Sequence, residues 1–466
     1  MGDGSVFRRQ EQTAAAISRL SAFAVGLEHA ALPAAVSDRL PLLVSDLAGV
    51  TVAGMRTPEL AALVEAWPLP AGAAPLPGTD VVTSPETSAR LAAVAACSLE
   101  LDEGNKYAAG HPAAHVFFAA VAAAQEAGRP VSGDRFLTAV AVGYEVAARF
   151  GRATTSGEGW HPHGHWGATG AACAAALLLD ATPEQVAAAI DASTGLVHVT
   201  PWGTVLDGDF TRNLWIAGAN IAGLHAARLA LAGLVDNPGT TAHSLGGLVG
   251  QLDPESLVGD LGERWLAAEG YLKQHAACSY THPAIDLVQA LLAGGAWRAD
   301  DVVAVRVRTH SLARPLLGRH PRNRLAAMFS LPFVVATAVV SGTVDPSTME
   351  PGSAAFARAE AFSDRVEVVV DEALDAHLPH LRCTEVRVEL ADGSVVGLGA
   401  PNPLGDAHYF PLGPDEVRAK LERLLGVADA GAVLDAVAAL PGAPDARPVL
   451  ARLALARRAT SQVSDR

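Results

Sequence analysis

One short segment of the chain gathers side chains that can accept, donate or stabilise a proton. Between Leu99 and Pro112 the sequence places three carboxylic acids, a lysine and a histidine, and Gly104 and Gly110 indicate a loop. Imidazole changes charge near neutral pH, so His111 could act as a base that a neighbouring acid orients. The alternative interpretation is a solvated surface loop between two helices.

Lysine is almost absent from the rest of the chain. Of 34 lysines and arginines, only three are lysines: Lys106, Lys273 and Lys420. A compact ammonium whose pKa can shift does acid–base work that a guanidinium cannot, so lysines in such a chain are candidates for function. An i,i+4 pair with Glu416 on a helix accounts for Lys420. No such pair accounts for Lys106 or Lys273, although chance survival is an alternative.

A second polar segment, residues 273–286, contains Lys273, Cys278 and His282. It lies where the pattern of the chain changes from helical to mixed, and domain junctions are favoured positions for small-molecule clefts. We therefore expect these side chains to face a cleft.

Three histidines, His161, His163 and His165, alternate in a short run. In an extended segment their imidazoles fall on one side, as in some metal sites. Nearby, only Glu158 and Cys173 could complete a ligand shell, so we expect the wall of a polar pocket and no bound metal. Ordinary loop histidines are the other alternative.

Signatures of cofactor and hydrolase chemistry are missing from the sequence. It contains no GxGxxG after a strand, no P-loop, no HExxH and no GxSxG elbow. The remaining class of chemistry is catalysis by ionisable side chains alone, without a cofactor. The formal net charge of −15 disfavours nucleic acid and anionic membrane surfaces as partners. An anionic substrate would need a local cluster of positive charge.

The elements that position these side chains are predicted to be mostly helices. Half of the 466 residues are hydrophobic but only 5% are aromatic, and this Ala-, Leu- and Val-rich composition suits closely packed helices. Residues 12–265 predict helix after helix. Ser132 begins one that ends at Gly151, Thr182 starts a capping box, and the small residues of Ile216–Leu231 allow close approach.

The pattern becomes mixed near residue 270. Val303–Arg308 alternates, with its valines on one side, and Val366–Val370 and Thr384–Leu390 predict further strands. A turn at residues 391–394 leads into the second strand of a hairpin. Leu325–Gly342 carries no charge and predicts one buried helix, because it lacks the aromatic ends of a membrane span.

The remaining pattern completes a two-domain organisation. Pro414–Leu425 predicts a helix that Gly426 stops, and the C-terminal helices are expected to rejoin the first domain. We therefore predict a mainly α fold. A large all-helical domain, residues 1–268 and 405–466, is formed by both chain ends, and residues 269–404 form a smaller inserted α+β lid domain.

Cysteine usage indicates a reducing compartment. The four cysteines lie far apart without short-range pairing, and residues 1–10 lead into no apolar core of a signal peptide. We expect a cytoplasmic protein.

The order and spacing of the motifs resemble the MmgE/PrpD family of dehydratases, decarboxylases and epimerases. The resemblance runs from about residue 15 to about residue 425. It rests on residues 99–103, 110–112, 161–162, 273–282, 329–332 and 402–406.

The resemblance implies a helical domain made from both chain ends, a lid, a homodimer and no cofactor. It places His111 and Lys273 in the pocket, with Glu100 where the family usually has Asp. The chain departs from residues common in the family at five positions, which are Gly104, Arg212, Trp215, Cys278 and Ser311. The scaffold is kept and the pocket is altered.

Function is expected to follow from proton removal next to a carboxylate. The resemblance implies a cofactor-free lyase, a dehydratase or decarboxylase, that acts on a small di- or tricarboxylic acid. The alternatives are an epimerase on the same scaffold and an inactive scaffold that binds a ligand or partner. The candidate catalytic residues are His111, Lys273, Glu100 and Asp102. The candidate substrate-binding residues are Arg212, His161, His163, Cys278, His282 and Lys106.

Overall fold

Small side chains let the helices of the first half pack closely around one central helix. The computed structural model describes residues 3–236, 238–295 and 297–454. Its central helix, α8 (Gly167–Leu178), contacts α6 (Pro112–Glu126), α7 (Gly133–Ala153) and α11 (Thr211–Leu231). A Cβ on Gly170 would lie 2.2 Å from the carbonyl oxygen of Gly143 on α7, so the close approach of α7 and α8 requires glycine there.

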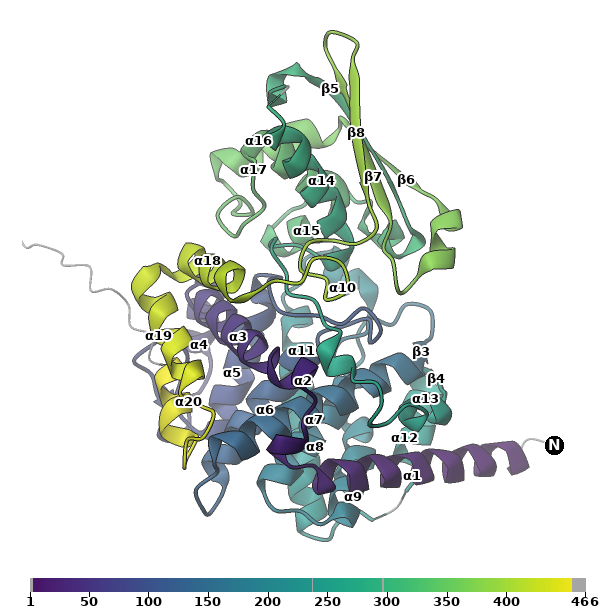
Figure 1. Ribbon diagram of the computed structural model, residues 1–466, viewed down its shortest axis with the longest axis vertical. Coiled ribbons are helices and arrows are strands. Elements are labelled where there is room, and N and C mark those ends of the chain that lie inside the picture. The colour runs from purple at the N-terminus through teal and green to yellow at the C-terminus, as the bar shows by residue number, and fades with distance from the viewer. Residues whose placement is uncertain (1–2, 237, 296, 455–466) are drawn as a thin grey trace, which may run out of the picture.

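The other elements of this helical body surround that centre (Figure 1). The longer helices are α1 (Asp3–Gly26), α3 (Leu40–Met55), α4 (Pro58–Ala66), α5 (Pro85–Ser98) and α9 (Pro183–Ser193). Short helices are α2 (Ala34–Ser37), α10 (Trp202–Leu206), α12 (Thr240–His243) and α13 (Pro254–Val258). Two small antiparallel pairs join β1 (Ala74–Pro75) to β2 (Val82–Thr83) and β3 (Thr154–Ser156) to β4 (Gly250–Leu252).

Local capping signals set the starts of two of these helices. The Ser132 hydroxyl accepts a hydrogen bond from the backbone N–H of Arg135, and Thr182 forms the predicted capping box with Gln185, which confirms both starts. The predicted stop at Gly151 is wrong, because α7 continues to Ala153. A Cβ on Gly151 would lie 2.8 Å from the Cβ of Ala108, so this glycine instead lets a loop lie against α7.

A four-stranded sheet forms the β part of the second half. Its strand order is β6-β5-β7-β8, with β5 (Val302–Thr309) parallel to β6 (Val366–Val370) and antiparallel to β7 (Thr384–Leu390). The predicted hairpin from β7 into β8 (Val395–Ala400) is confirmed. The helix α14 (His282–Ala293) contacts β7 and β8.

The prediction that Val303 lies on the same side of the strand as Val305 and Val307 is wrong. Val305 and Val307 are fully buried, whereas Val303 is 50% exposed. The register between β5 and β7 shifts between Val302 and Ala304, and such a bulge inverts the alternation of side chains on one side of it.

The uncharged run Leu325–Gly342 forms two helices and not one. α15 (Arg324–Met328) ends, and α16 (Leu331–Ser341) begins after Ser330, whose hydroxyl accepts from the N–H of Phe333. Pro332 fits the first turn of a helix but not its interior, which explains the break. The prediction of burial is confirmed, and α16 packs on α17 (Ala354–Ser363).

One described helix, α11, is long and apolar enough to cross a membrane. Of its most apolar 18-residue window, 72% is buried inside the protein. Burial of this kind is what the central helix of a folded domain shows.

The C-terminal helices return to the N-terminal half. α18 (Pro414–Leu425), α19 (Val427–Ala438) and α20 (Arg447–Ala454) all contact α3, and Figure 1 shows them in yellow beside the purple N-terminal helices. Gly426 stops α18 with a φ of 85°, as expected. The mainly α fold with a small α+β part is confirmed. The domain limits at residues 268 and 405 stay a prediction.

Lys420 of α18 points inward and does not form the predicted surface pair with Glu416. Its Nζ lies 2.6 Å from Asp46 Oδ1 and donates to the carbonyl oxygen of Leu101 at 3.0 Å, and its side chain is fully buried. Glu416 instead accepts from the N–H of Gly413 at the start of the helix. The prediction is wrong because α18 packs with this face on α3, which carries Asp46.

Replacing Lys420 with methionine is expected to lower the free energy of unfolding by about 3–5 kcal/mol. The change leaves the Asp46 carboxylate buried without its cation, which costs that order of energy. Urea unfolding measures it. The double variant Lys420→Met/Asp46→Asn should recover much of the loss, and Glu416→Gln should cost far less. A Lys420→Met variant as stable as the wild type would contradict the assignment of the pair.

Candidate active site

Residues from the helical body and from the α+β part enclose a polar cavity of about 30 Å³. Imidazole, guanidinium, phenol, thiol and carboxylate groups share its wall, which is the composition of a site for acid–base chemistry. The lining residues are Glu100, Ala109, Gly110, His111, His161, Pro162, His163, Trp202, Arg212, Tyr271, Cys278, Ser279, Tyr280, Phe329 and Arg382.

The loop that carries the acids is held in a strained conformation. Glu100 has a φ of 53° and Ala109 a φ of 52°, a left-handed conformation that costs a non-glycine residue about 1–3 kcal/mol. Gly104 and Tyr271 exchange backbone hydrogen bonds of 3.0 and 2.6 Å, and the Asn105 amide donates to the carbonyl of Leu266. The strain and the bonds that hold it fit a loop shaped for function and not a solvated surface loop.

His111 stands at the start of α6 with one ring nitrogen held. Its Nδ1 lies 2.5 Å from the carbonyl oxygen of Glu103 and 3.4 Å from Asp102 Oδ2, so Nδ1 is the nitrogen that carries the proton. Nε2 has no hydrogen-bond partner among the residues that the structure describes. Burial lowers the pKa of His111 below its usual 6.5, and the ring is neutral at pH 7.

Glu100 lies between two buried cations. It pairs with Arg212 and accepts from Lys273 Nζ at 3.0 Å, and Nζ also lies 3.7 Å from Asp102 Oδ1. Burial alone would raise the pKa of Glu100, but Arg212 and Lys273 hold it below its usual value. Burial alone would lower the pKa of Lys273, but Glu100 and Asp102 raise it well above its usual value. Glu100 is therefore an anion and Lys273 a cation at neutral pH.

Two of the three alternating histidines line the cavity. The rings of His161 and His163 pack edge to face with their centroids 4.2 Å apart, and the centroids of His163 and His111 are 4.6 Å apart. Burial and the nearby cations lower the pKa of both well below the usual value, so they are neutral. His165 turns its Nε2 to the carbonyl of His161 instead.

Among the described residues, a cluster that could hold a metal ion lies at this same site and not at the alternating histidines. Glu100, Asp102 and His111 offer ligand atoms within 4.8 Å of one another. Lys273 and Arg212 already pair with these carboxylates. Their positive charges oppose the entry of a divalent cation, so the donor set fits a metal poorly.

Two predicted substrate-binding residues do not line the cavity. Lys106 Nζ lies 2.9 Å from Asp406 Oδ2 and 2.8 Å from the carbonyl of His380, and these contacts hold its loop to the turn at Asp406. His282 Nε2 donates to the carbonyl of Ala277 at 3.1 Å. Both side chains serve internal contacts, which no local pattern distinguishes from ligand contacts.

Two other predicted substrate-binding residues, Cys278 and Arg212, line the cavity, and the charge state of each limits what it can do there. Burial raises the pKa of the Cys278 thiol to about 11, so it is neutral and not a thiolate nucleophile. Arg212 also donates to the carbonyl of Cys97 and to Asn213 Oδ1, and its charge is matched by Glu100.

Several wall residues were missed by sequence reasoning, namely Arg382, Tyr271, Tyr280 and Ser279. The two tyrosines and the serine lie within the polar region around residues 271–282, which was a usable signal. The neighbourhood of Arg382 carried none.

Tyr271 explains one departure from the family pattern. A Cβ on Gly104 would lie 2.3 Å from the Tyr271 hydroxyl, so the phenol fills the space that a side chain at 104 would take. At a second departure, the ring centroids of Trp215 and His161 lie 5.4 Å apart. Ser311 is outside the wall, and its N–H donates to Asp375.

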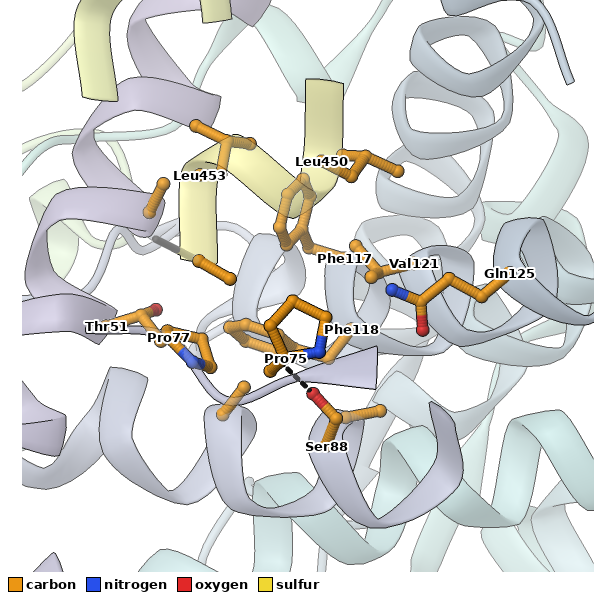
Figure 2. A pocket seen from close by; sticks show the side chains of 14 residues that line it. Thr51, Pro75, Pro77, Ser88, Phe117, Phe118, Val121, Gln125, Leu450 and Leu453 are labelled. Atoms are coloured by element: carbon orange, nitrogen blue, oxygen red, sulfur yellow. Dashed lines mark hydrogen bonds between the residues drawn. The ribbon is translucent and has the colours of Figure 1, made fainter. Parts of the chain in front are cut away.

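A second cavity, of about 50 Å³, lies where α20 covers α3, α5 and α6 (Figure 2). Phe117, Phe118 and Leu450 form much of its wall, and the Ser88 hydroxyl donates to the carbonyl of Pro75 at 2.7 Å. None of its lining side chains titrates near neutral pH. Of these two cavities, the polar one is therefore the candidate active site.

Two models of one protein family match most of the chain. The model of the MmgE/PrpD N-terminal domain matches residues 18–253, and that of the MmgE/PrpD C-terminal domain matches residues 275–438. The chain belongs to the MmgE/PrpD family.

Two relatives indicate the class of reaction. The cis-aconitate decarboxylase of Aspergillus terreus is 25% identical over 413 residues, which cover 82% of this chain and 83% of the relative. The cis-aconitate decarboxylase-like protein oryM of Aspergillus oryzae is 25% identical over 364 residues, which cover 70% of this chain and 73% of the relative. Family and relatives support a lyase-type enzyme that acts on a carboxylic acid.

Proposed function

We propose that the protein removes a proton from the carbon next to a carboxylate of a small di- or tricarboxylic acid. The observation that carries this proposal is a neutral, buried His111 at the wall of a cavity that also holds buried cations. Loss of a hydroxyl from the neighbouring carbon then gives dehydration. Decarboxylation, the reaction named in the relatives, needs no prior loss of a proton: CO₂ leaves, the electron pair of the broken C–C bond stays on the substrate carbon, and this carbon takes up one proton from solvent, which His111 can deliver.

The charge states of the site support His111 as the base and Lys273 as a fixed charge. An imidazole that is neutral at pH 7 can take a proton, whereas an ammonium with a raised pKa cannot. The Glu103 carbonyl and Asp102 orient the ring through Nδ1 and leave Nε2 to act. Arg212 in the cavity wall, and Lys273 behind Glu100, stabilise the negative charge that grows on the substrate carboxylate as the proton leaves.

The reaction class is tested by incubating the purified protein with a panel of di- and tricarboxylic acids, cis-aconitate included. An unsaturated product with loss of water, or a product with loss of CO₂, supports a lyase. A product that differs from the substrate only in configuration would make the protein an epimerase. Absence of any product would contradict the proposal.

The pH profile of kcat/KM is expected to show an acid limb with its midpoint below 6.5. The pKa of His111 is lowered from 6.5, so the base is lost to protonation only as the pH falls below that value. Lys273, whose pKa is raised, adds no limb between pH 6 and pH 9. Steady-state rates across this range measure it. A limb centred clearly above 7 would show that a different group is the base.

The proposal extends to cofactor, assembly and location. All the groups invoked belong to the chain itself, so we propose a cofactor-free reaction; activity that is lost on chelation and restored by a divalent metal would contradict it. We further propose a cytoplasmic homodimer. Light scattering should then give about twice the 47.8 kDa chain mass.

A further inference from the structure

Arg382 is a buried cation without a carboxylate partner among the described residues. Its side chain lines the polar cavity and the residue is 3% exposed. Nη1 donates to the hydroxyl of Ser279 at 3.2 Å, and Nε has no hydrogen-bond partner within the described part of the chain. The guanidinium lies over the rings of Tyr271 and Tyr280, at 5.3 and 5.1 Å from their centroids.

The other charges around the cavity cancel one another. Arg212 and Lys273 face the two carboxylates of Glu100 and Asp102. Glu103 does not line the cavity, and burial raises the pKa of its carboxyl to about 8, which favours the neutral form at pH 7. His111 and the other wall histidines are neutral as well. Three cations against two anions leave one positive charge, and that charge is Arg382.

A buried cation that lacks a partner is costly, so a protein keeps one where a ligand supplies the missing anion. The two flanking tyrosine rings hold the planar guanidinium in one orientation, which prepares its parallel N–H groups for a two-oxygen acceptor. A carboxylate has that shape and charge.

We propose that Arg382 binds a carboxylate of the substrate, one remote from the carbon that reacts at His111. The inference rests on the proposed function and adds a requirement to it, namely a second acidic group on the substrate. A monocarboxylate has no group for both places, so small di- and tricarboxylates are the preferred class.

Because Arg382 belongs to the α+β part, a ligand that contacts both Arg382 and His111 connects the two parts of the molecule. The backbone N–H of Arg382 donates to Asn402 Oδ1 and to the carbonyl of Pro401, which fix it in the α+β part. His111 belongs to the helical body. A substrate held at both ends therefore bridges the two parts, and loss of Arg382 should appear mainly as weaker binding.

Binding of succinate and cis-aconitate, with neutral succinamide as the uncharged comparison, tests this proposal by calorimetry. Arg382→Gln should weaken the binding of both acids by roughly 10- to 100-fold, the value of a charged hydrogen-bonded contact, and leave succinamide almost unchanged. Arg382→Lys should recover part of the loss. Arg387→Gln, which changes an exposed arginine on β7, is the matched control and should bind as the wild type does.

Two further readouts separate a binding role from a structural one. Arg382→Gln should raise KM at least tenfold with a smaller change in kcat, and it should not lower Tm, because it removes an unpaired buried cation. If the wild type turns over an acid and Arg382→Gln has the same KM, the inference is wrong and the proposed function stands. If neither acid binds the wild type at about 10 mM, the carboxylate site is wrong.

Discussion

Replacing His111 with asparagine is expected to lower kcat/KM by about 10²- to 10⁴-fold, the range for loss of a general base. Asparagine keeps an N–H that can donate to the carbonyl of Glu103, in the place of Nδ1, but it has no basic nitrogen in the place of Nε2. The variant therefore removes the base and keeps the contact that shapes the loop.

Measurement of kcat/KM should be paired with a thermal melt, which is expected to change little. His225→Asn is the matched control, because His225 does not line the cavity and its ring contacts Glu86. That variant should retain full activity. A His111→Asn enzyme within tenfold of the wild type would remove His111 from the mechanism.

Replacing Lys273 with methionine is expected to have two effects of different origin. The rate should fall by about 10²- to 10³-fold, because the charge that stabilises the developing anion is lost. The free energy of unfolding should fall by about 3–5 kcal/mol, because Asp102 loses its cation and Glu100 keeps only Arg212. The side chain is fully buried, so truncation there is not the mild change expected of a lysine at the edge of a cleft.

The double variant Lys273→Met/Asp102→Asn separates these effects. Removing the Asp102 charge should restore much of the stability, since the cation and the anion then leave together and Glu100 keeps Arg212, but it should not restore the rate. Urea unfolding and steady-state kinetics on the same preparations measure both. A double variant that regains near-normal kcat/KM would show that Lys273 acts on stability alone.

The rarity of lysine carried more information than its local context did. Lys106 lies in the loop before α6, Lys273 contacts Glu100 of that loop, and Lys420 donates to its Leu101 carbonyl. All three lysines are buried around one loop. A compact ammonium with three donors fits such a buried position more readily than a large planar guanidinium.

Local signals predicted most of the fold and failed where distant segments decide. The caps at Ser132 and Thr182 depend on neighbours within one turn, and they were predicted. The exposure of Val303 depends on a bulge against β7, and the inward turn of Lys420 depends on Asp46 of α3. Neither partner is visible in a sequence window.

The same reason divides the candidate site. Glu100, Asp102 and His111 share one loop, so their proximity was predictable. The path of the chain through the α+β part brings Arg382 to the cavity. That Arg382 lacks a carboxylate partner becomes evident only when the position of every nearby carboxylate is known. Such a residue is recognised by what it lacks, and sequence patterns do not record that.

The most direct test of the account is exchange of a carbon-bound proton. The wild-type protein is incubated in D₂O with di- and tricarboxylic acids, cis-aconitate included, and deuterium at the carbon next to a carboxylate is followed by NMR. The account predicts deuterium in the substrate or product of at least one acid, and none above background with His111→Asn. Absence of deuterium in every acid, or equal incorporation by the wild type and His111→Asn, would contradict it.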